Sequence, residues 1–497
     1  MSTQSIAGAV DRSLLRRLAG QGAILSSTFA AGQVCSFARN AALGHALSKG
    51  DFGVGATILL ALQTLDIATD LATDRMILQD ADGDDPRLLA VAHLAQLTRG
   101  IATAVLLCLA GPLIAQFFNV NEVNWAFSAA AVVPLVKGLT HLDCRRMQRG
   151  VSHGPFAATE LGAQLAALIL TVPLIWARGD FMTVVWLAIA QTLAGVIISH
   201  AVAERPYRIG YDRRLLARIF RFGCPVLLGA LPLIAVYHGE RMLIGHFRGV
   251  EELAGYTAAF LITMVPGLIV SKLALSLMLP VLAARKNEVA RFNLKSRLMF
   301  EAGSVLAASY VVFFAVAGNH MMALTFGAAY GGLGPLVTCL AIMFAVRMVQ
   351  AGPGTVLMSL GDTRSLLFAG LLRAVALGLA LEVAARGGGL AEIAAAGVAG
   401  EVLSLLYVAW RLEAVREPLG AAFLARTVAT ALPIGIAVGL PPATLLGSAG
   451  SLVAIGVGLL AACGAACLAI GLSPSLLGMA ARQWRFNRQG PAAARWN

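Results

Sequence analysis

Charged side chains inside long apolar stretches are the residues of this sequence best suited to chemistry. Arg39 lies within the apolar residues 23–47, and Asp66, Asp70 and Asp74 follow in the next apolar stretch. Their spacing of four predicts that the three carboxylates share one face of a helix. Ionisable groups in an apolar phase are costly, so they usually face a protein interior or a water-filled path. These residues are therefore candidates for binding a charged ligand or for pairing with other charges.

The same pattern continues along the chain. The basic residues within apolar stretches are Arg39, Arg99, Lys137, Arg241, Lys272, Arg347 and Arg373. The acidic ones are Asp66, Asp70, Asp74, Glu160, Glu240, Glu301, Glu382 and Glu401. Side chains near the end of a stretch reach the polar boundary by snorkelling, which accounts for Asp74, Glu160, Glu240, Glu301 and Glu382. The charges nearest the middle of a stretch are Arg99, Lys137, Lys272, Arg373, Asp66, Asp70 and Glu401.

Two interpretations of the central charges stay open. In the first, they form ion pairs between neighbouring helices, with Arg39 bound to Asp66 or Asp70. In the second, unpaired cations line a cavity, because Lys137 and Lys272 have no acidic residue within one turn of their own helices. Such a cavity would suit a phosphate or pyrophosphate group, which arginine binds with two parallel hydrogen bonds and lysine binds as a point charge.

Motifs for catalysis, nucleotide binding and metal binding are absent from the sequence. It holds neither the phosphate-binding GxxxxGK[ST] pattern nor the HExxH zinc pattern. Its eight histidines are scattered, and its seven cysteines form no CxxC pair. We therefore expect no cofactor, no metal and no enzymatic activity.

Composition indicates a membrane protein. Hydrophobic residues make up 58% of the 497 residues and charged residues only 13%, about half the charged share of soluble domains. Mean hydropathy is +0.78. A soluble protein of this size would need far more polar surface.

The apolar stretches predict an all-α fold with about 14 transmembrane helices. A spanning helix needs about 20 mostly apolar residues. The predicted spans are residues 23–47, 53–78, 88–115, 125–144, 155–177, 181–203, 222–246, 254–283, 298–318, 333–358, 365–385, 391–410, 424–440 and 449–471.

The distribution of basic residues between loops predicts the orientation. With the N-terminus in the cytoplasm, twenty-seven basic residues fall on the cytoplasmic side and four fall outside. The four outside are Lys49, Arg178, Arg248 and Arg386. The positive-inside rule thus favours cytoplasmic N- and C-termini. Cytoplasmic basic residues meet anionic lipid headgroups, so the net charge of +12 indicates contact with membrane lipids rather than binding of nucleic acid.

Two clusters of identities share one offset of 202 residues. The matching pairs are Arg39 and Arg241, Gly53 and Gly255, Arg145 and Arg347, Gln148 and Gln350, and Gly150 and Gly352. Six spans fit this offset, which predicts two parallel six-helix lobes with a central site. By the repeat, Arg347 corresponds to Arg145 and is placed near the cytoplasmic mouth. The predicted domains are residues 1–204, a basic amphipathic linker at 205–221 that lies at the headgroup surface, 222–412, and 413–497.

Two short motifs resemble the polysaccharide flippases. Residues 39–53 begin with an arginine that ends the first span and close on Phe52-Gly53. Residues 239–245 pair Glu240 with Arg241 ahead of Gly255-Tyr-Thr-Ala258, which resembles the family's Gly-Tyr-x-x-Ala helix. The chain is therefore identified as similar to the oligosaccharide flippase (Wzx-like) branch of the multidrug/oligosaccharidyl-lipid/polysaccharide exporter superfamily.

The resemblance implies a flippase of the bacterial inner membrane that moves undecaprenyl-pyrophosphate-linked glycans by alternating access. Its expected partners are the lipid-linked glycan, membrane lipids and other polysaccharide-assembly proteins. Arg39 and Lys272 match places where relatives carry cavity cations, whereas Asp66 and Asp70 stand where relatives have a cation. The predicted substrate-binding residues are Arg39, Arg99, Lys137, Arg241, Lys272 and Arg347.

Two alternatives remain. A cation-coupled multidrug antiporter of the same fold would use Asp66, Asp70 or Glu401 to bind protons or sodium. An intramembrane glycan polymerase or transferase would need a large outside loop, and the longest one expected, residues 318–332, is small.

Overall fold

The computed structural model describes residues 12–150, 152–416, 419–420, 423, 450–471, 473 and 475–478. Within these residues every regular element is a helix. Ten helices are long and apolar enough to cross a membrane, or eleven if the bent pair Arg213–Ala230 and Ile234–Phe247 counts as one span. The expectation of an all-α polytopic membrane protein is confirmed. The predicted span at 424–440 lies outside the described residues, and the count of fourteen stays a prediction.

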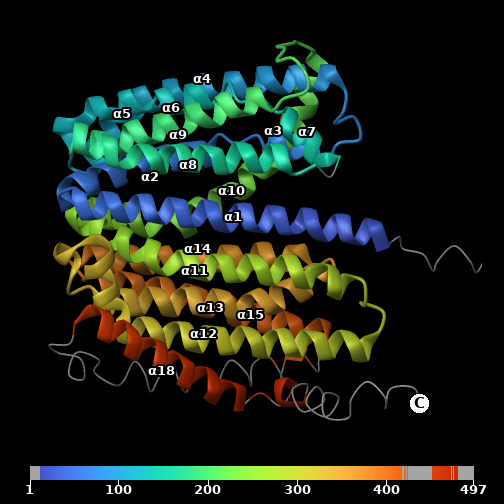
Figure 1. The fold of residues 1–497 in the computed structure, drawn as a ribbon, viewed down its shortest axis with the longest axis vertical. Coiled ribbons are helices and arrows are strands. Elements are labelled where there is room, and N and C mark those ends of the chain that lie inside the picture. Colours follow the sequence, from blue (N-terminus) through green and yellow to red (C-terminus); the bar gives the residue numbers. More distant parts are fainter. Residues whose placement is uncertain are drawn as a thin grey trace, which may run out of the picture. The chain divides into compact units, whose positions relative to one another are not determined.

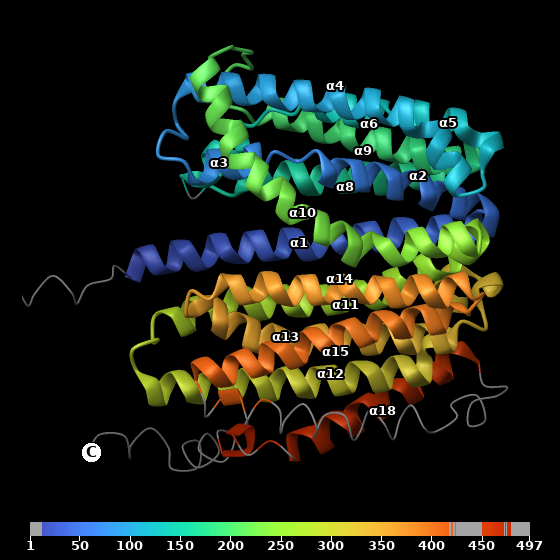
Figure 2. The same cartoon turned by 180° about the vertical axis from the view of Figure 1, so that it is seen from behind.

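The chain divides into two compact units, Met1–Thr257 and Ala258–Asn497. The domain boundaries proposed from the sequence stay predictions. In unit 1, α1 packs against α8, α8 packs against α9, and α4 packs against α5 and α6 (Figures 1 and 2). Its helices are α1 (Arg12–Ala46), α2 (Lys49–Ala68), α3 (Thr73–Gln79), α4 (Pro86–Phe117), α5 (Asn124–Ala130), α6 (Val132–Lys137), α7 (Asp143–Arg149), α8 (Gly154–Ala177), α9 (Met182–Ala201) and α10 (Arg213–Phe247).

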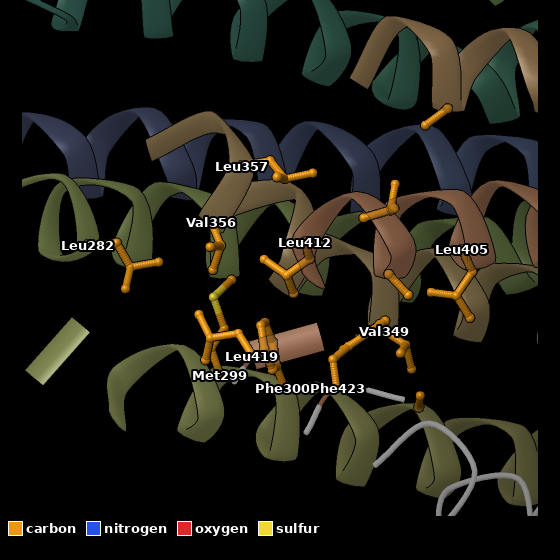
Figure 3. Packing of buried hydrophobic residues seen from close by; sticks show 14 of the residues in the cluster. Leu282, Met299, Phe300, Val349, Val356, Leu357, Leu405, Leu412, Leu419 and Phe423 are labelled. Atoms are coloured by element: carbon orange, nitrogen blue, oxygen red, sulfur yellow. The ribbon is translucent and has the colours of Figure 1, made fainter. Parts of the chain in front are cut away.

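In unit 2, α12 packs against α13 and α18, and α15 packs against α13 and α14 (Figure 2). Figure 3 shows its apolar core, where Phe300, Val349 and Leu405 meet from three helices. The helices are α11 (Val250–Ala283), which begins in unit 1, α12 (Val289–Phe326), α13 (Gly334–Ser359), α14 (Thr363–Ala385), α15 (Leu390–Val415) and α18 (Ser451–Gly471).

Short polar side chains define where several helices begin. Ser48 accepts a hydrogen bond from the backbone N–H of Asp51 at the start of α2, and Asp85 accepts one from Arg87 at the start of α4. Asp362 does the same for Ser365 at the start of α14. These N-caps satisfy backbone donors that a helix leaves unpaired. Burial alone would raise the pKa of the Asp362 carboxyl, but hydrogen bonds from Arg411 and Ser365 hold that pKa below its ordinary value.

The predicted span at 53–78 is broken, which corrects the prediction that its three aspartates share one helical face. Helix α2 ends at Ala68 and α3 begins at Thr73. Between them, Asp70 accepts a hydrogen bond from the backbone N–H of Ala72 at 3.0 Å, and Ala72 has the left-handed φ of 50°. An aspartate that bonds its own nearby backbone competes with the helix. Asp74 instead pairs with Arg145 of α7 at 3.2 Å.

The predicted span at 125–144 is also interrupted. Helices α5 and α6 are short, and residues 138–142 separate them from α7. Within the described part of the chain, these three helices do not form one continuous span.

The second half of the predicted amphipathic linker is the start of a long helix. Residues 213–221 form the first turns of α10, and Ile219 is fully buried against residues of α3 and α4. Leu215 and Leu216 pack against the same cluster. Arg218 pairs with Asp80 at 2.6 Å and with Asp82 at 2.8 Å. Part of the apolar face of this segment therefore packs on protein, and its placement at the headgroup surface stays a prediction.

Substitution of Gly53 tests a backbone contact between α2 and the start of α11. A Cβ at Gly53 would overlap the carbonyl oxygen of Val250 and lie 2.7 Å from its carbonyl carbon. We expect Gly53→Ala to destabilise the protein by about 2 kcal/mol, because neither backbone can yield without shifting a helix. The thermal unfolding temperature of the detergent-purified protein measures this.

Gly50→Ala is the matched control. It lies in the first turn of the same helix, and its added Cβ would meet only the Ser48 hydroxyl at 3.8 Å. Its unfolding temperature should stay at or slightly above that of the unmodified protein, since alanine favours helix. Equal unfolding temperatures for the two variants would show that α2 does not touch Val250.

Candidate functional site

Asp66 is the centre of a charged cluster in unit 1. Its Oδ1 lies 2.7 Å from Arg99 Nη2, and its Oδ2 lies 2.7 Å from Lys137 Nζ. Asp70 Oδ1 lies 3.4 Å from Arg99 Nη1. One carboxylate thus joins a residue of α4 to a residue of α6, and two of the predicted ligands form ion pairs with two of the predicted ion-coupling residues.

Arg99 also binds the C-terminal end of α2. Its Nη2 donates to the carbonyl oxygen of Asp66 at 2.7 Å, and its Nε donates to Thr69 Oγ1 at 3.4 Å. Thr103 donates to the same hydroxyl at 3.0 Å. The last carbonyls of a helix carry partial negative charge, so a guanidinium there is favourable. Because α2 ends at Ala68, the carbonyl oxygen of Asp66 is open to this bond from Arg99.

Two glycines bring Arg99 and Lys137 together. Each cation has a glycine as its next residue, Gly100 in α4 and Gly138 after α6. A Cβ at Gly100 would lie 2.6 Å from the carbonyl oxygen of Pro134 and 2.8 Å from the Cα of Gly138. Only glycine allows backbones to approach this closely. The crossing places both cations within reach of Asp66.

A second charged cluster lies in unit 2. Glu401 of α15, whose side chain is 2% exposed, lies 2.6 Å from Arg347 Nε through Oε1 and 2.9 Å from Arg373 Nε through Oε2. Gln350 donates to Ser404 Oγ at 2.9 Å and accepts a hydrogen bond from Arg373. One buried carboxylate thus holds guanidinium groups from α13 and α14.

A glycine again permits the contact. A Cβ at Gly400 would overlap the Cβ of Ala376 and lie 3.1 Å from the carbonyl oxygen of Arg373. Gly400 directly precedes Glu401, so the close crossing of α14 and α15 positions the carboxylate beside Arg373.

The remaining predicted ligands have other surroundings. Arg39 donates to Gln191 of α9, which corrects the proposed pairing of Arg39 with Asp66 or Asp70. Arg241 donates to the carbonyl oxygen of Tyr237 at 2.7 Å. Lys272 is an exposed side chain of α11. The structure therefore brings together Arg99 and Lys137 with Asp66 and Asp70, and Arg347 with Glu401.

The ion pair of Lys137 supports the first interpretation of the central charges, pairing between helices, over the second, in which Lys137 is an unpaired cation. Spacing along one helix says nothing about residues on a neighbouring helix, and Asp66 comes from α2. Sequence reasoning also missed the supporting polar groups, which are Thr69, Thr103, Gln191 and Ser404. A glycine next to a charged residue in an apolar stretch was the available signal for the tight crossings.

The two parts of the second motif behind the family resemblance, around Glu240 and Tyr256, meet in space. The Tyr256 hydroxyl, fully buried, donates to the Glu240 carboxylate, so the two halves of the second motif contact each other. Within the described part of the chain, no three His, Cys, Asp or Glu side chains are arranged to hold a metal ion.

Comparison with known proteins identifies the family. Residues 43–335 match the family described as polysaccharide biosynthesis protein. The chain belongs to this family. It is 20% identical over 298 residues to the teichuronic acid biosynthesis protein TuaB of Bacillus subtilis (strain 168), covering 59% of this chain and 61% of that protein. The chain thus aligns with less than two thirds of this relative.

Solved structures of transporters share the fold of this polysaccharide biosynthesis family member. The lipid II flippase MurJ in an inward closed conformation has a TM-score of 0.68 at 9% identity, covering 91% of this chain and 99% of that one. A multidrug resistance MATE family transporter in its inward-facing conformation has a TM-score of 0.60 at 14% identity, covering 78% and 96%. A MOP superfamily transporter from Pyrococcus furiosus has a TM-score of 0.53 at 19% identity, covering 80% of this chain and 96% of that one. The resemblance to the Wzx-like branch is confirmed, and these structures support the fold.

Replacing Gly100 tests the crossing that positions Arg99 and Lys137. We expect Gly100→Ala to destabilise the protein by about 2 kcal/mol, because the new Cβ meets backbone atoms of residues 134 and 138. Gly154→Ala is the control, since a Cβ there has no neighbour within 4 Å. Thermal unfolding of both purified variants measures the difference, and a Gly100→Ala variant as stable as the control would contradict the crossing.

Replacing Glu401 tests the buried pairing in unit 2. Glu401→Gln leaves two guanidinium groups beside a neutral amide, and we expect a loss of about 2–3 kcal/mol in stability. Glu382→Gln is the matched control, because Glu382 is 56% exposed and pairs with Arg386 one helical turn away. It should change stability by at most about 0.5 kcal/mol.

The double variant Arg373→Gln/Glu401→Gln gives an independent readout. It should unfold at a higher temperature than Glu401→Gln alone, because it removes one of the two uncompensated cations. Additive losses from the two substitutions would show that Arg373 and Glu401 do not interact.

Proposed function

We propose that this protein is a flippase that moves lipid-linked oligosaccharide or polysaccharide repeat units across the bacterial inner membrane by alternating access. The carrier in this proposal is undecaprenyl pyrophosphate, and both termini lie in the cytoplasm. The observation that carries it is the pair of charged clusters, around Asp66 and Glu401, within apolar helices of a polysaccharide biosynthesis family member. The protein transports its substrate and performs no covalent chemistry.

Each cluster by itself supplies cations that suit a pyrophosphate headgroup. Arg99, Arg347 and Arg373 are held by carboxylates that fix their orientation, and oriented guanidinium groups bind phosphate oxygens in pairs. Lys137 is 45% exposed and supplies a mobile point charge. Arg39, Arg241 and Lys272 remain further candidate ligands under this proposal. Membrane lipids and other polysaccharide-assembly proteins are the proposed partners.

A deletion strain tests the function. Loss of the gene should accumulate undecaprenyl-linked repeat units on the inner leaflet, measured by extraction and mass spectrometry of lipid-linked glycans in spheroplasts. The intact gene should restore export, and Lys137→Gln or Arg347→Gln should reduce it by about tenfold or more if each forms a charge-assisted bond to the headgroup. Arg386→Gln, at an exposed surface pair, is the control that should restore export fully.

Other outcomes would overturn the proposal. Drug hypersensitivity without accumulated lipid-linked glycan would favour a cation-coupled multidrug antiporter that uses Asp66, Asp70 or Glu401. Single repeat units left unpolymerised on the outer leaflet would favour a polymerase. Membrane levels of each variant, measured by immunoblot, separate lost transport from lost protein.

A further inference from the structure

The connection between α4 and α5 lies at one end of unit 1. The His246 ring near the end of α10 stacks on the Phe117 ring, with centroids 4.4 Å apart, and Trp125 packs against Phe181 at the start of α9. The backbone N–H of Phe181 donates to the Asp51 carboxylate in the first turn of α2 at 3.3 Å. The ends of α4 and α10 and the starts of α2, α5 and α9 therefore share this end. With the cytoplasmic termini proposed above, it is the outer end.

The backbone at the end of α4 directs neighbouring side chains to opposite sides. Asn119 has the left-handed φ of 56°. Its N–H donates to the carbonyl oxygen of Gln116 at 3.1 Å, and the N–H of Val120 donates to that of Ala115 at 2.8 Å. This pair of bonds is the Schellman arrangement, in which asparagine can take the left-handed position. Phe118 is buried, and its two neighbours in the sequence are exposed.

This connection combines exposed aromatic rings with exposed amides. Phe117 is 41% exposed and Trp125 is 50% exposed. Asn119, Asn121 and Asn124 are exposed as well. Asn119 donates to a backbone carbonyl of α10 at 3.3 Å, whereas the other two amides make no hydrogen bond within the described part of the chain. The face of an aromatic ring is electron-rich and attracts the polarised C–H bonds of a sugar ring. An amide both donates and accepts hydrogen bonds, as sugar hydroxyls require.

The charges at this end disfavour an anionic ligand. The basic side chains at its helix connections are Lys49, Arg178 and Arg248. The acidic ones are Asp51, Glu122, Asp180, Glu251 and Glu252. Because acidic groups outnumber basic ones, phosphate groups and anionic lipid headgroups are repelled here. Anchoring at the membrane surface would account for the aromatic rings, but it gives no reason for three asparagines among them.

We propose that the surface formed by Phe117, Asn119, Asn121, Asn124 and Trp125 binds uncharged sugar residues of the transported glycan. The proposal rests on the proposed function and places the glycan portion of the substrate at the outer end. Sugar rings stack on the aromatic faces, and their hydroxyls exchange water for the asparagine amides. Such an exchange gains little net free energy, so binding is weak and reversible, as release of the glycan requires. We call these five residues the outer sugar surface.

The probe for this surface is the repeat-unit oligosaccharide that mild acid releases from the lipid-linked glycan of the deletion strain. Saturation-transfer NMR measures its dissociation constant on the full-length protein in lipid nanodiscs. Trp125→Ala should weaken binding by about tenfold, because one stacked ring is lost. Trp125→Phe should restore most of the affinity, since phenylalanine keeps an aromatic face. The double variant Asn121→Ala/Asn124→Ala should also weaken binding by about tenfold, because two amides are lost.

Trp176→Ala is the matched control. Trp176 is 85% exposed and is the second-last residue of α8, which ends at the same end of unit 1. Its neighbours in the sequence include no asparagine. This variant should therefore bind the oligosaccharide as the unmodified protein does. All the substituted side chains are exposed, so the variants should unfold at the temperature of the unmodified protein.

The possible failures are distinguishable. No binding of the oligosaccharide to the unmodified protein, or equal affinities for the unmodified protein, Trp125→Ala and the asparagine double variant, would overturn the outer sugar surface and leave the proposed function standing. Equal losses in Trp125→Ala and Trp176→Ala would assign the effect to anchoring of both rings at the membrane surface, which also overturns this inference. A deletion strain that accumulates no lipid-linked glycan would overturn the proposed function, and the outer sugar surface with it.

Discussion

The pairing of charges inside apolar helices is the constraint on which both units depend. An isolated ion in the low-dielectric interior of a membrane protein is costly, and removing one member of a buried pair leaves that cost uncompensated. In unit 1, Asp66 joins α2 to Arg99 and Lys137, and in unit 2, Glu401 joins α15 to Arg347 and Arg373. Each carboxylate thus fixes three helical elements relative to one another, and the same bond that stabilises the unit orients its cations.

Close helix crossings make these bonds geometrically possible. Gly100 and Gly138 let α4 touch the end of α6 backbone to backbone, and Gly400 lets α15 approach α14. Helices in membranes gain little from hydrophobic burial between them, so small residues that allow close packing carry much of their association. Each of these glycines adjoins a charged residue in the sequence. The same close crossing therefore packs two helices together and positions the charged side chain beside its partner.

Much of the fold could be predicted because hydropathy and basic-residue counts are local properties of the chain. The described helices coincide with most predicted spans, and the structure brings the two parts of the second family motif into contact at Glu240 and Tyr256. The break after Ala68 was not predicted, because aspartates spaced by four residues are compatible with a helix. They are equally compatible with a side chain that hydrogen-bonds to nearby backbone, as Asp70 does. The ion pair of Lys137 was not predicted, because its partner lies on another helix. A pattern within one segment carries no information about contacts with another segment.

The two clusters share a design but differ in access to water, and this difference separates their roles. Glu401 is 2% exposed, whereas the Asp66 and Lys137 side chains are 39% and 45% exposed. A buried carboxylate between two guanidinium groups exchanges neither proton nor partner without a large desolvation cost, so it acts as a fixed support. The Asp66 carboxylate instead pairs with an arginine that is 11% exposed and with a lysine that is 45% exposed, so water reaches its lysine partner. Asp66 lies two residues before the end of α2 at Ala68, where its side chain stays partly exposed to water.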